Sequence, residues 1–384
     1  MLDSESKTVR RQADARRAVF AVGAGFWCGP AGWVLVLAML AVGVAAISFT
    51  YWSGDDACGL VQPDLTATGL SAVGGSSEAD GLLPSDLPRS AVDGLSLADR
   101  DEGRLFTVVL DNIAVARPAA SIAAATLVWE APVEGGITRL LALFRDSADL
   151  RRIGPVRSVR PYFVDWTEEY GAVLTHVGGS PQALSLLHGS GLFELDEMRQ
   201  GGYFWRDRSR SAPHNVYTSS DLLHEALVDY GEMEDIADLD IDRPFRTSNP
   251  DLVDFGDVVE IGVDFGSPDF DVTWVFDDGS GTYLRHQGAG RFLDENQSVV
   301  AANNVIVQVT DISVIDSVGR RSIRTSGTGS ALLFQDGRVR EASWSKEGDG
   351  RTRFLDGESG DELPLNVGTT WIEVVGEVEA VSYQ

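Results

Sequence analysis

The hydrophobic and polar positions divide the chain into an apolar N-terminal run, a polar segment and two patterned regions. Residues 18–54 contain no charged side chain, and residues 33–51 are the most apolar part of that run. At about 1.5 Å per residue, a helix over 33–51 nearly crosses a hydrocarbon core of roughly 30 Å. The pattern therefore predicts a transmembrane helix within residues 18–54.

The first patterned region, residues 104–240, alternates strand-like and helix-like segments. Short apolar runs predict strands at 106–110, 126–129, 138–144 and 172–177. Helical periodicity predicts helices at 160–170, 181–187 and 219–230, the second with proline in its first turn and the third with a serine cap. Strands interleaved with helices indicate a mixed α/β sheet domain.

Helical periodicity is lost in the second patterned region, residues 250–378, which follows an acidic, proline-containing bridge at 232–250. Strands are predicted at 258–263, 272–276, 282–285, 304–309, 330–334, 339–345 and 370–375. Turn residues at 277–281 and 335–337 predict hairpins. The expected fold class is therefore α+β: an N-terminal transmembrane helix, a mixed α/β sheet domain, and a mostly antiparallel β domain.

The charges beside the apolar run predict its orientation. Five basic residues precede it: Lys7, Arg10, Arg11, Arg16 and Arg17. The positive-inside rule then makes residues 1–17 a cytoplasmic tail and places the body outside the cytoplasm, after a small, polar, Gly-rich linker at 55–103. A cleaved signal peptide and a lipoprotein signal ending at Cys58 are the alternatives. An uncleaved signal-anchor is favoured, because the run exceeds a signal-peptide core and Asp55-Asp56-Ala57 does not fit a lipidation site.

The amino-acid composition narrows the classes of binding partner that we expect. The chain has 31 Lys+Arg against 58 Asp+Glu, a formal net charge of −27. Such an acidic body is not expected to bind nucleic acid or anionic membrane surfaces by general electrostatics. The two cysteines, Cys28 and Cys58, precede the body, and the chain has no Cys/His cluster with zinc spacing. No metal or cofactor is predicted.

Four motifs, at 130–139, 154–161, 176–181 and 204–217, carry the candidate chemistry. Gly135-Gly136 and Gly178-Gly179 allow sharp turns and close approach to a ligand, and arginine binds phosphate or carboxylate through two parallel hydrogen bonds. We expect an anion held by Arg157, Arg160 and the amides of Gly179 and Ser180, at the start of a helix. The full predicted ligand-binding set is Arg139, Arg157, Ser158, Arg160, His176, Gly178, Gly179, Ser180, Arg206, His214 and Asn215.

Structural interpretations of the same residues stay open. The glycine pairs can be simple turns, and His176 can be a hydrogen-bonded core residue. Arg157 and Arg160 can belong to a structural network with Glu130, Glu134, Asp165 or Glu168. For catalysis, His176 and His214 are the candidate general bases, with Arg157, Arg160 or Arg206 stabilising charge. No G-x-S-x-G elbow is present.

The four motifs, read in order, resemble the YerB-like family of bacterial lipoproteins, the domain of unknown function numbered 3048. They include 130–139, 153–162, 176–184, Phe204-Trp-Arg-Asp207 and Ala212-Pro-His-Asn-Val-Tyr217. Residues 273–276 through 370–375 resemble the C-terminal domain of that family. The resemblance implies an exported, membrane-tethered bacterial protein without an assigned activity. Members commonly carry a lipid-modified cysteine, a role that the transmembrane segment takes over here.

Together these observations predict a membrane-anchored, extracytoplasmic protein of the cell envelope that binds an anionic envelope ligand through an Arg/His/Gly-lined cleft in the first domain. The expected partners are the cell membrane, through the N-terminal helix, that anionic ligand, and other envelope proteins. A hydrolase or transferase acting on a phosphate-bearing substrate and a protein-interaction scaffold are the alternatives.

Overall fold

The computed structural model describes residues 89–96, 103–145, 148–233, 243–247, 258–288, 290–348 and 350–384, all within one compact unit, 75–384. The predicted cytoplasmic tail, transmembrane helix and most of the linker, with Cys28 and Cys58, lie outside these residues. Within the described ranges, no helix is both long and apolar enough to cross a membrane. These ranges form a mixed α/β structure with a large sheet and few helices.

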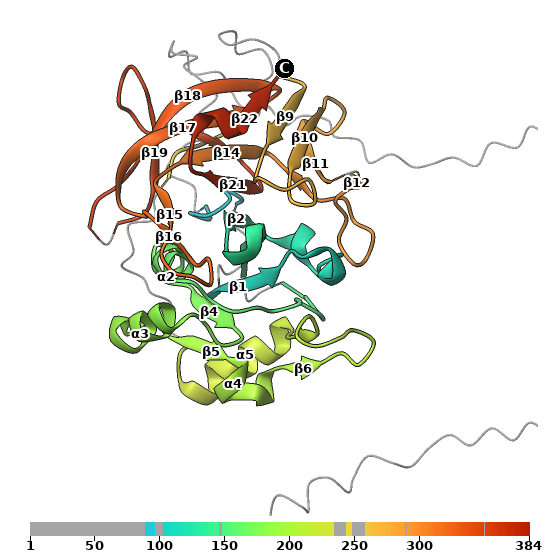
Figure 1. The fold of residues 1–384 in the computed structure, drawn as a ribbon. Helices are drawn as coiled ribbons and strands as arrows, with labels where there is room; N and C mark the ends of the chain where they lie inside the picture. Colours follow the sequence, from blue (N-terminus) through green and yellow to red (C-terminus); the bar gives the residue numbers. More distant parts are fainter. Residues whose placement is uncertain are drawn as a thin grey trace, which may run out of the picture. The chain divides into compact units, whose positions relative to one another are not determined.

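A ten-stranded sheet takes strands from both predicted domains (Figure 1). Its order is β19-β18-β17-β14-β21-β2-β3-β1-β4-β5. The bounds are β1 (Leu105–Asp111), β2 (Leu127–Pro132), β3 (Thr138–Arg145), β4 (Val173–His176), β5 (Glu194–Asp196), β14 (Asn304–Val309), β17 (Gly327–Gln335), β18 (Arg338–Lys346), β19 (Arg353–Asp356) and β21 (Thr370–Val375). β21 pairs in parallel with both β2 and β14, which joins the two halves.

The second sheet has the order β12-β11-β10-β9-β22, and β13 also pairs with β11. Its strands are β9 (Glu260–Val263), β10 (Val272–Asp277), β11 (Thr282–Gln287), β12 (Gly290–Arg291), β13 (Ala301–Ala302) and β22 (Val381–Tyr383). Three two-stranded pairs are β6 (Trp205–Arg206) with β7 (Val216–Tyr217), β15 (Ile312–Val314) with β16 (Arg321–Ile323), and β8 (Phe245–Arg246) with β20 (Leu365–Asn366).

Three helices begin within one residue of their predicted starts: α2 (Pro161–Glu168), α3 (Pro181–Ser190) and α5 (Ser220–Tyr230). The short α4 (Glu197–Gln200) was not predicted. Ser180 and Ser219 cap α3 and α5, because their side chains accept hydrogen bonds from the amides of Ala183 and Leu222. The predicted hairpin turn at 335–337 is also confirmed: Asp336 and Gly337 have φ values of 52° and 72°, as a type I′ turn requires.

Both faces of the large sheet are covered, so its strands are buried on two sides. Along β1, Phe106, Val108 and Leu110 belong to the core shared with the second sheet and α5. Leu105 and Val109 belong to the opposite core, which includes α2. There Trp129 stacks on Trp166 with ring centroids 4.5 Å apart. The loops that follow β1, β2 and β4 therefore leave from buried strands.

Buried charges connect the halves of the chain where β2 meets β21. Arg285 donates to Glu130 at 2.5 Å, and both side chains are fully buried. Glu130 also accepts hydrogen bonds from Asn112 and Thr138. Glu373, opposite Glu130 in the ladder, accepts from Trp274 at 2.9 Å. Two buried carboxyl groups therefore lie near one guanidinium, which contacts Glu130 directly.

Burial raises the pKa of Glu373 well above its usual value, and the nearby charge of Glu130 adds to the rise. A raised folded-state pKa stabilises the fold fully below the unfolded pKa, and this contribution is lost as the pH rises. Glu373→Gln is therefore expected to raise the melting temperature at pH 7 and to change it little near pH 4. Thermal denaturation at both pH values checks this, with the exposed Glu377→Gln as control. Greater stability of the wild type at pH 7 would contradict it.

Candidate functional site

The carboxyl ends of β1, β2, β4 and β5 lie at one edge of the large sheet, because these strands run in the same direction. β1 ends at Asp111, β2 leads into the turn at Glu134–Gly136, and β4 leads into Gly178. Residues 156–159 cross this edge: Val156 bridges to β1, and Val159 bridges to Gly179. Pieces of the predicted motifs are thus brought together at an edge where ligands commonly bind in α/β sheets.

The arginine cluster, defined as Arg139, Arg157 and Arg160, lies at this edge. Arg139 and Arg160 both donate to the carbonyl oxygen of Ser158, at 2.7 and 3.3 Å. Arg160 forms a two-pronged ion pair with Glu134. Arg160 with Glu134 is one of the structural ion pairs that the sequence analysis gave as an alternative to ligand binding. Burial raises the pKa of Glu134, but hydrogen bonding to Arg160 outweighs this effect and the net pKa is lowered.

Arg139 is the unbalanced charge of the cluster. It is buried, its Nε has no hydrogen-bond partner, and no ion pair of Arg139 occurs among the described residues. Burial lowers the pKa of Arg139 to about 10, and repulsion from Arg160 and Arg157 contributes. Three guanidinium groups therefore share the carboxylates of Asp111 and Glu134. An added anion would relieve this imbalance.

Asp111 connects the arginine cluster to His214. Its Oδ2 atom lies 2.6 Å from Nδ1 of His214 and 3.0 Å from Nε of Arg157. Asp111 is buried, whereas the side chains of Arg157 and His214 are 19% and 20% exposed. A carboxylate on Nδ1 favours the tautomer whose Nε2 accepts a proton. The sequence analysis did not identify Asp111, although this residue directly follows the predicted strand at 106–110.

His176 is a core residue and not an accessible base. Its ring is fully buried, with Nδ1 2.9 Å from the carbonyl oxygen of Gly178 and Nε2 2.6 Å from Glu194. Burial lowers the pKa of His176. The structural interpretation of His176 is therefore favoured over the catalytic one, because substrate has no access to the ring.

The backbone amides near Gly179 are not arranged as expected. The Gly178 amide donates to the carboxylate of Asp196 at 2.7 Å, and the Ser180 amide donates to the carbonyl oxygen of Val159 at 3.2 Å. The expectation that the Ser180 amide binds an external anion is therefore corrected, since its hydrogen is already used within the fold. Gly179 is needed for packing, because a Cβ there would lie 2.6 Å from the Val159 side chain.

Arg206 and Asn215 belong to the β6–β7 hairpin, whose loop carries His214. Arg206 pairs with Glu197 through two hydrogen bonds of 3.1 and 3.0 Å and also donates to Asn215. Asn215 is buried and donates to the carbonyl oxygens of Asp207 and Arg210. These contacts fold the loop, so Arg206 and Asn215 position His214 while Arg206 stays partly exposed.

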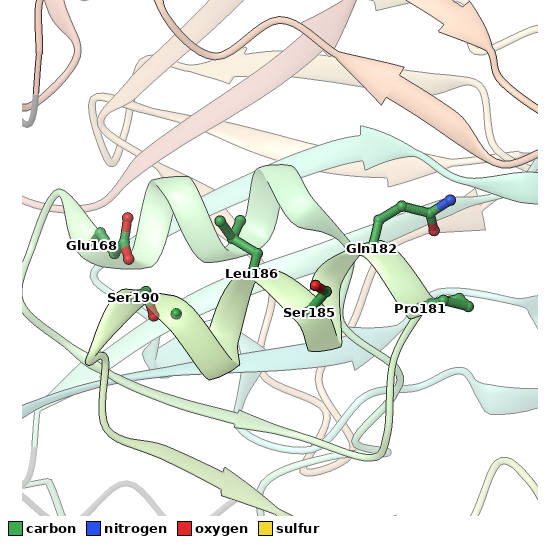
Figure 2. Close-up of a pocket in the computed structure, with 7 residues that line it drawn as sticks. Glu168, Pro181, Gln182, Ser185, Leu186 and Ser190 are labelled. Carbon is green, nitrogen blue, oxygen red and sulfur yellow. The ribbon is translucent and has the colours of Figure 1, made fainter.

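A shallow groove lies beside α2 and α3 (Figure 2). It is lined by Glu168, Pro181, Gln182, Ser185, Leu186, Gly189 and Ser190. None of the predicted ligand-binding residues lines it. Within the described ranges, no group of three or more His, Cys, Asp or Glu side chains is arranged to hold a metal ion.

Comparison with known proteins gives consistent matches. The family described as "Protein of unknown function (DUF3048) N-terminal domain" matches residues 94–232, and its C-terminal domain matches 261–372. The chain is 32% identical over 285 residues to "Putative lipoprotein YerB" of Bacillus subtilis (strain 168), which covers 73% of this chain and 84% of that protein. The crystal structure of YerB from Bacillus subtilis superposes with a TM-score of 0.67 at 29% identity, covering 77% of this chain and 99% of that chain.

Proposed function

The chain belongs to the DUF3048 family, and on that premise we propose that it is a membrane-anchored, extracytoplasmic protein of the bacterial cell envelope that binds an anionic ligand. Its relative YerB is named a lipoprotein, which supports attachment to a membrane. In this chain the apolar residues 18–54 would be the single-pass anchor, with the N-terminus in the cytoplasm.

The observation that carries the ligand proposal is the buried Arg139 guanidinium, which has no carboxylate partner among the described residues and shares the Ser158 carbonyl oxygen with Arg160. A phosphate or carboxylate would enter beside Arg157, Ser158 and the exposed Gly135, the accessible members of this edge. The Gly135-Gly136 turn leaves open space where side chains would otherwise stand. Phosphate-bearing lipid-linked sugars and peptidoglycan carboxylates are the envelope components with this chemistry.

Arg157→Ala is the sharpest test of binding. We expect affinity for inorganic phosphate to fall by roughly 10- to 100-fold, because a hydrogen bond to a charged group contributes about 1.5–3 kcal/mol. Titration calorimetry of the full chain measures this, with Arg151→Ala as the matched control, since Arg151 is 88% exposed on the preceding loop. Equal affinities of the wild type and both variants would refute the proposal.

A second candidate function is hydrolysis or transfer on a phosphate-bearing substrate, with His214 as general base. It is favoured by the contact of Asp111 with Nδ1 of His214, which leaves Nε2 as the proton acceptor. His214→Gln would then abolish turnover while phosphate binding persists. Loss of binding in this variant would instead make His214 part of the binding site alone.

A further inference from the structure

The Asp111 cluster, defined as Asp111, Arg157 and His214, has one carboxylate for two side chains that can carry positive charge. Oδ2 of Asp111 lies 2.6 Å from Nδ1 of His214 and 3.0 Å from Nε of Arg157. The other oxygen, Oδ1, accepts a hydrogen bond from the amide of Ile113 at 3.3 Å. A single buried oxygen atom therefore serves the imidazole and the guanidinium together.

Protonation of His214 changes the charge balance of the Asp111 cluster. While the imidazole is neutral, the negative charge of Asp111 balances the positive charge of Arg157. An imidazolium adds a second positive charge against the same carboxylate and leaves one positive charge in excess. Histidine is the side chain that ordinarily changes charge between about pH 5 and pH 8. The cluster thus becomes cationic when His214 takes up a proton.

The other charged groups around His214 do not offset an added proton. Arg139 lies opposite Asp111 in the β1–β3 ladder, and Arg117 lies close enough to interact with the charge of Asp111. Both are cations, and Arg208 of the loop before His214 is exposed. The remaining charged side chains of the hairpin have partners elsewhere: Arg206 with Glu197, Asp207 with Arg152, and Arg210 with the carbonyl oxygens of Ala116 and Pro118. Among the described residues, no ion pair joins His214 to a second carboxylate.

Both positive members of the Asp111 cluster are accessible to a solute. The side chains of Arg157 and His214 are partly exposed, whereas Asp111 is buried beneath them. Arg157 also donates to the carbonyl oxygen of Pro213, the residue before His214, at 3.3 Å. This contact holds the guanidinium against the loop that carries the imidazole. An anion that contacts Arg157 therefore lies close to the His214 ring.

We propose that the anion site takes up its ligand together with a proton from solvent, which His214 accepts. The inference rests on the proposed function and adds the regulation of that site. Because Nδ1 faces Asp111, Nε2 is the nitrogen that receives the proton. An anion beside Arg157 favours the imidazolium, and the imidazolium strengthens anion binding by the same coupling free energy. Binding is strongest at acidic pH and weakens as the pH rises and His214 releases its proton.

Sulfate binding to the full chain, measured by titration calorimetry at pH 5.5 and pH 8, tests this coupling. Sulfate keeps its charge throughout this range, whereas phosphate groups change theirs. We expect the affinity of the wild type to be about tenfold higher at pH 5.5, on the scale of one added charge-assisted hydrogen bond. Titrations at an intermediate pH, in buffers of different ionisation enthalpy, should show that binding takes up protons.

Two histidine variants assign the effect to one side chain. A lower net negative charge at acidic pH favours any anion, so the gain in affinity that remains in His214→Gln measures this general effect. We expect His214→Gln to show a smaller gain than the wild type and no proton uptake on binding. His188→Gln is the matched control, because His188 is an exposed histidine on α3, and it should behave like the wild type.

Each remaining outcome is decisive. A gain in the wild type no larger than that in His214→Gln would overturn the inference, and so would binding without proton uptake. If sulfate binds equally well at both pH values and Arg157→Ala abolishes that binding, the anion site stands and the proton coupling falls. A wild type that binds sulfate at neither pH would overturn the proposed function and the coupling together.

Discussion

Replacing Arg285 with methionine is expected to lower the free energy of unfolding by about 3–5 kcal/mol, the usual cost of leaving one partner of a buried ion pair uncompensated. The variant leaves Glu130 without its cation beside the buried Glu373. It also removes a guanidinium that lies 4.1 Å from the ring centroid of Phe292 and 4.7 Å from that of Trp371. Urea denaturation of the purified full chain measures the loss.

Two companion variants separate charge from packing. Arg151→Met makes the same chemical change on an 88% exposed side chain and should be nearly neutral. Adding Glu130→Gln to Arg285→Met should recover part of the lost stability, because the remaining side chain is then uncharged. If Arg285→Met is as mild as Arg151→Met, the two halves of the chain are not held together by this charge cluster.

Lys346→Met is expected to destabilise the fold by a similar amount, about 3–5 kcal/mol at pH 7. Lys346 of β18 lies 2.9 Å from Glu169, which directly follows α2 and is fully buried. Glu169 also accepts hydrogen bonds from the amide and hydroxyl of Thr352. Without the lysine, a buried carboxylate remains with only these neutral donors.

The loss in Lys346→Met should depend on pH in a defined direction. Burial raises the pKa of Glu169, and Lys346 opposes the rise. In the variant the folded-state pKa is raised further, so its stability is highest below the unfolded pKa of about 4.3 and is lost as the pH rises. Denaturation at pH 4 and pH 7 should show the larger deficit at pH 7. Glu169→Gln in the same background should remove this difference, and a deficit unchanged by pH would argue against a buried charge.

Both expected effects arise from contacts that no local pattern encodes. Glu130, Arg285 and Glu373 belong to β2, β11 and β21, and they meet because β2 pairs with β21 and the second sheet packs on that face. The sequence marked Glu130 as a motif residue and a possible partner of Arg157 or Arg160, but not as the partner of Arg285. Arg285 and Glu373 were strand residues without a distinguishing neighbour. Their burial depends on which strands pair, and hydrophobic periodicity does not report pairing.

The sequence likewise identified most residues of the candidate site, but not the contacts among them. The motif residues Arg139, Arg157, Arg160 and His214 were identified from residue type and context. Their gathering at one edge follows from parallel strands that end together. The sequence left His176 open as a core residue or a candidate base, because a short apolar strand looks the same whether it ends in the core or at a ligand; its burial favours the core interpretation. Asp111 was missed because a lone aspartate after a strand has no local signature.

The sequence by itself predicted most of the strands longer than three residues, the helices α2, α3 and α5, the turn at Asp336-Gly337, a serine cap for α5, and the family to which the chain belongs. These features depend on side-chain period, on allowed φ values and on hydrogen bonds between near neighbours, all of which a linear pattern records. Only the tertiary structure decided that both halves share one sheet, that Arg160 is neutralised by Glu134 and that Arg139 has no carboxylate partner within the described part of the chain. Those outcomes depend on strand pairing and burial between residues far apart in the chain, where the free energy of a charge is set by its surroundings.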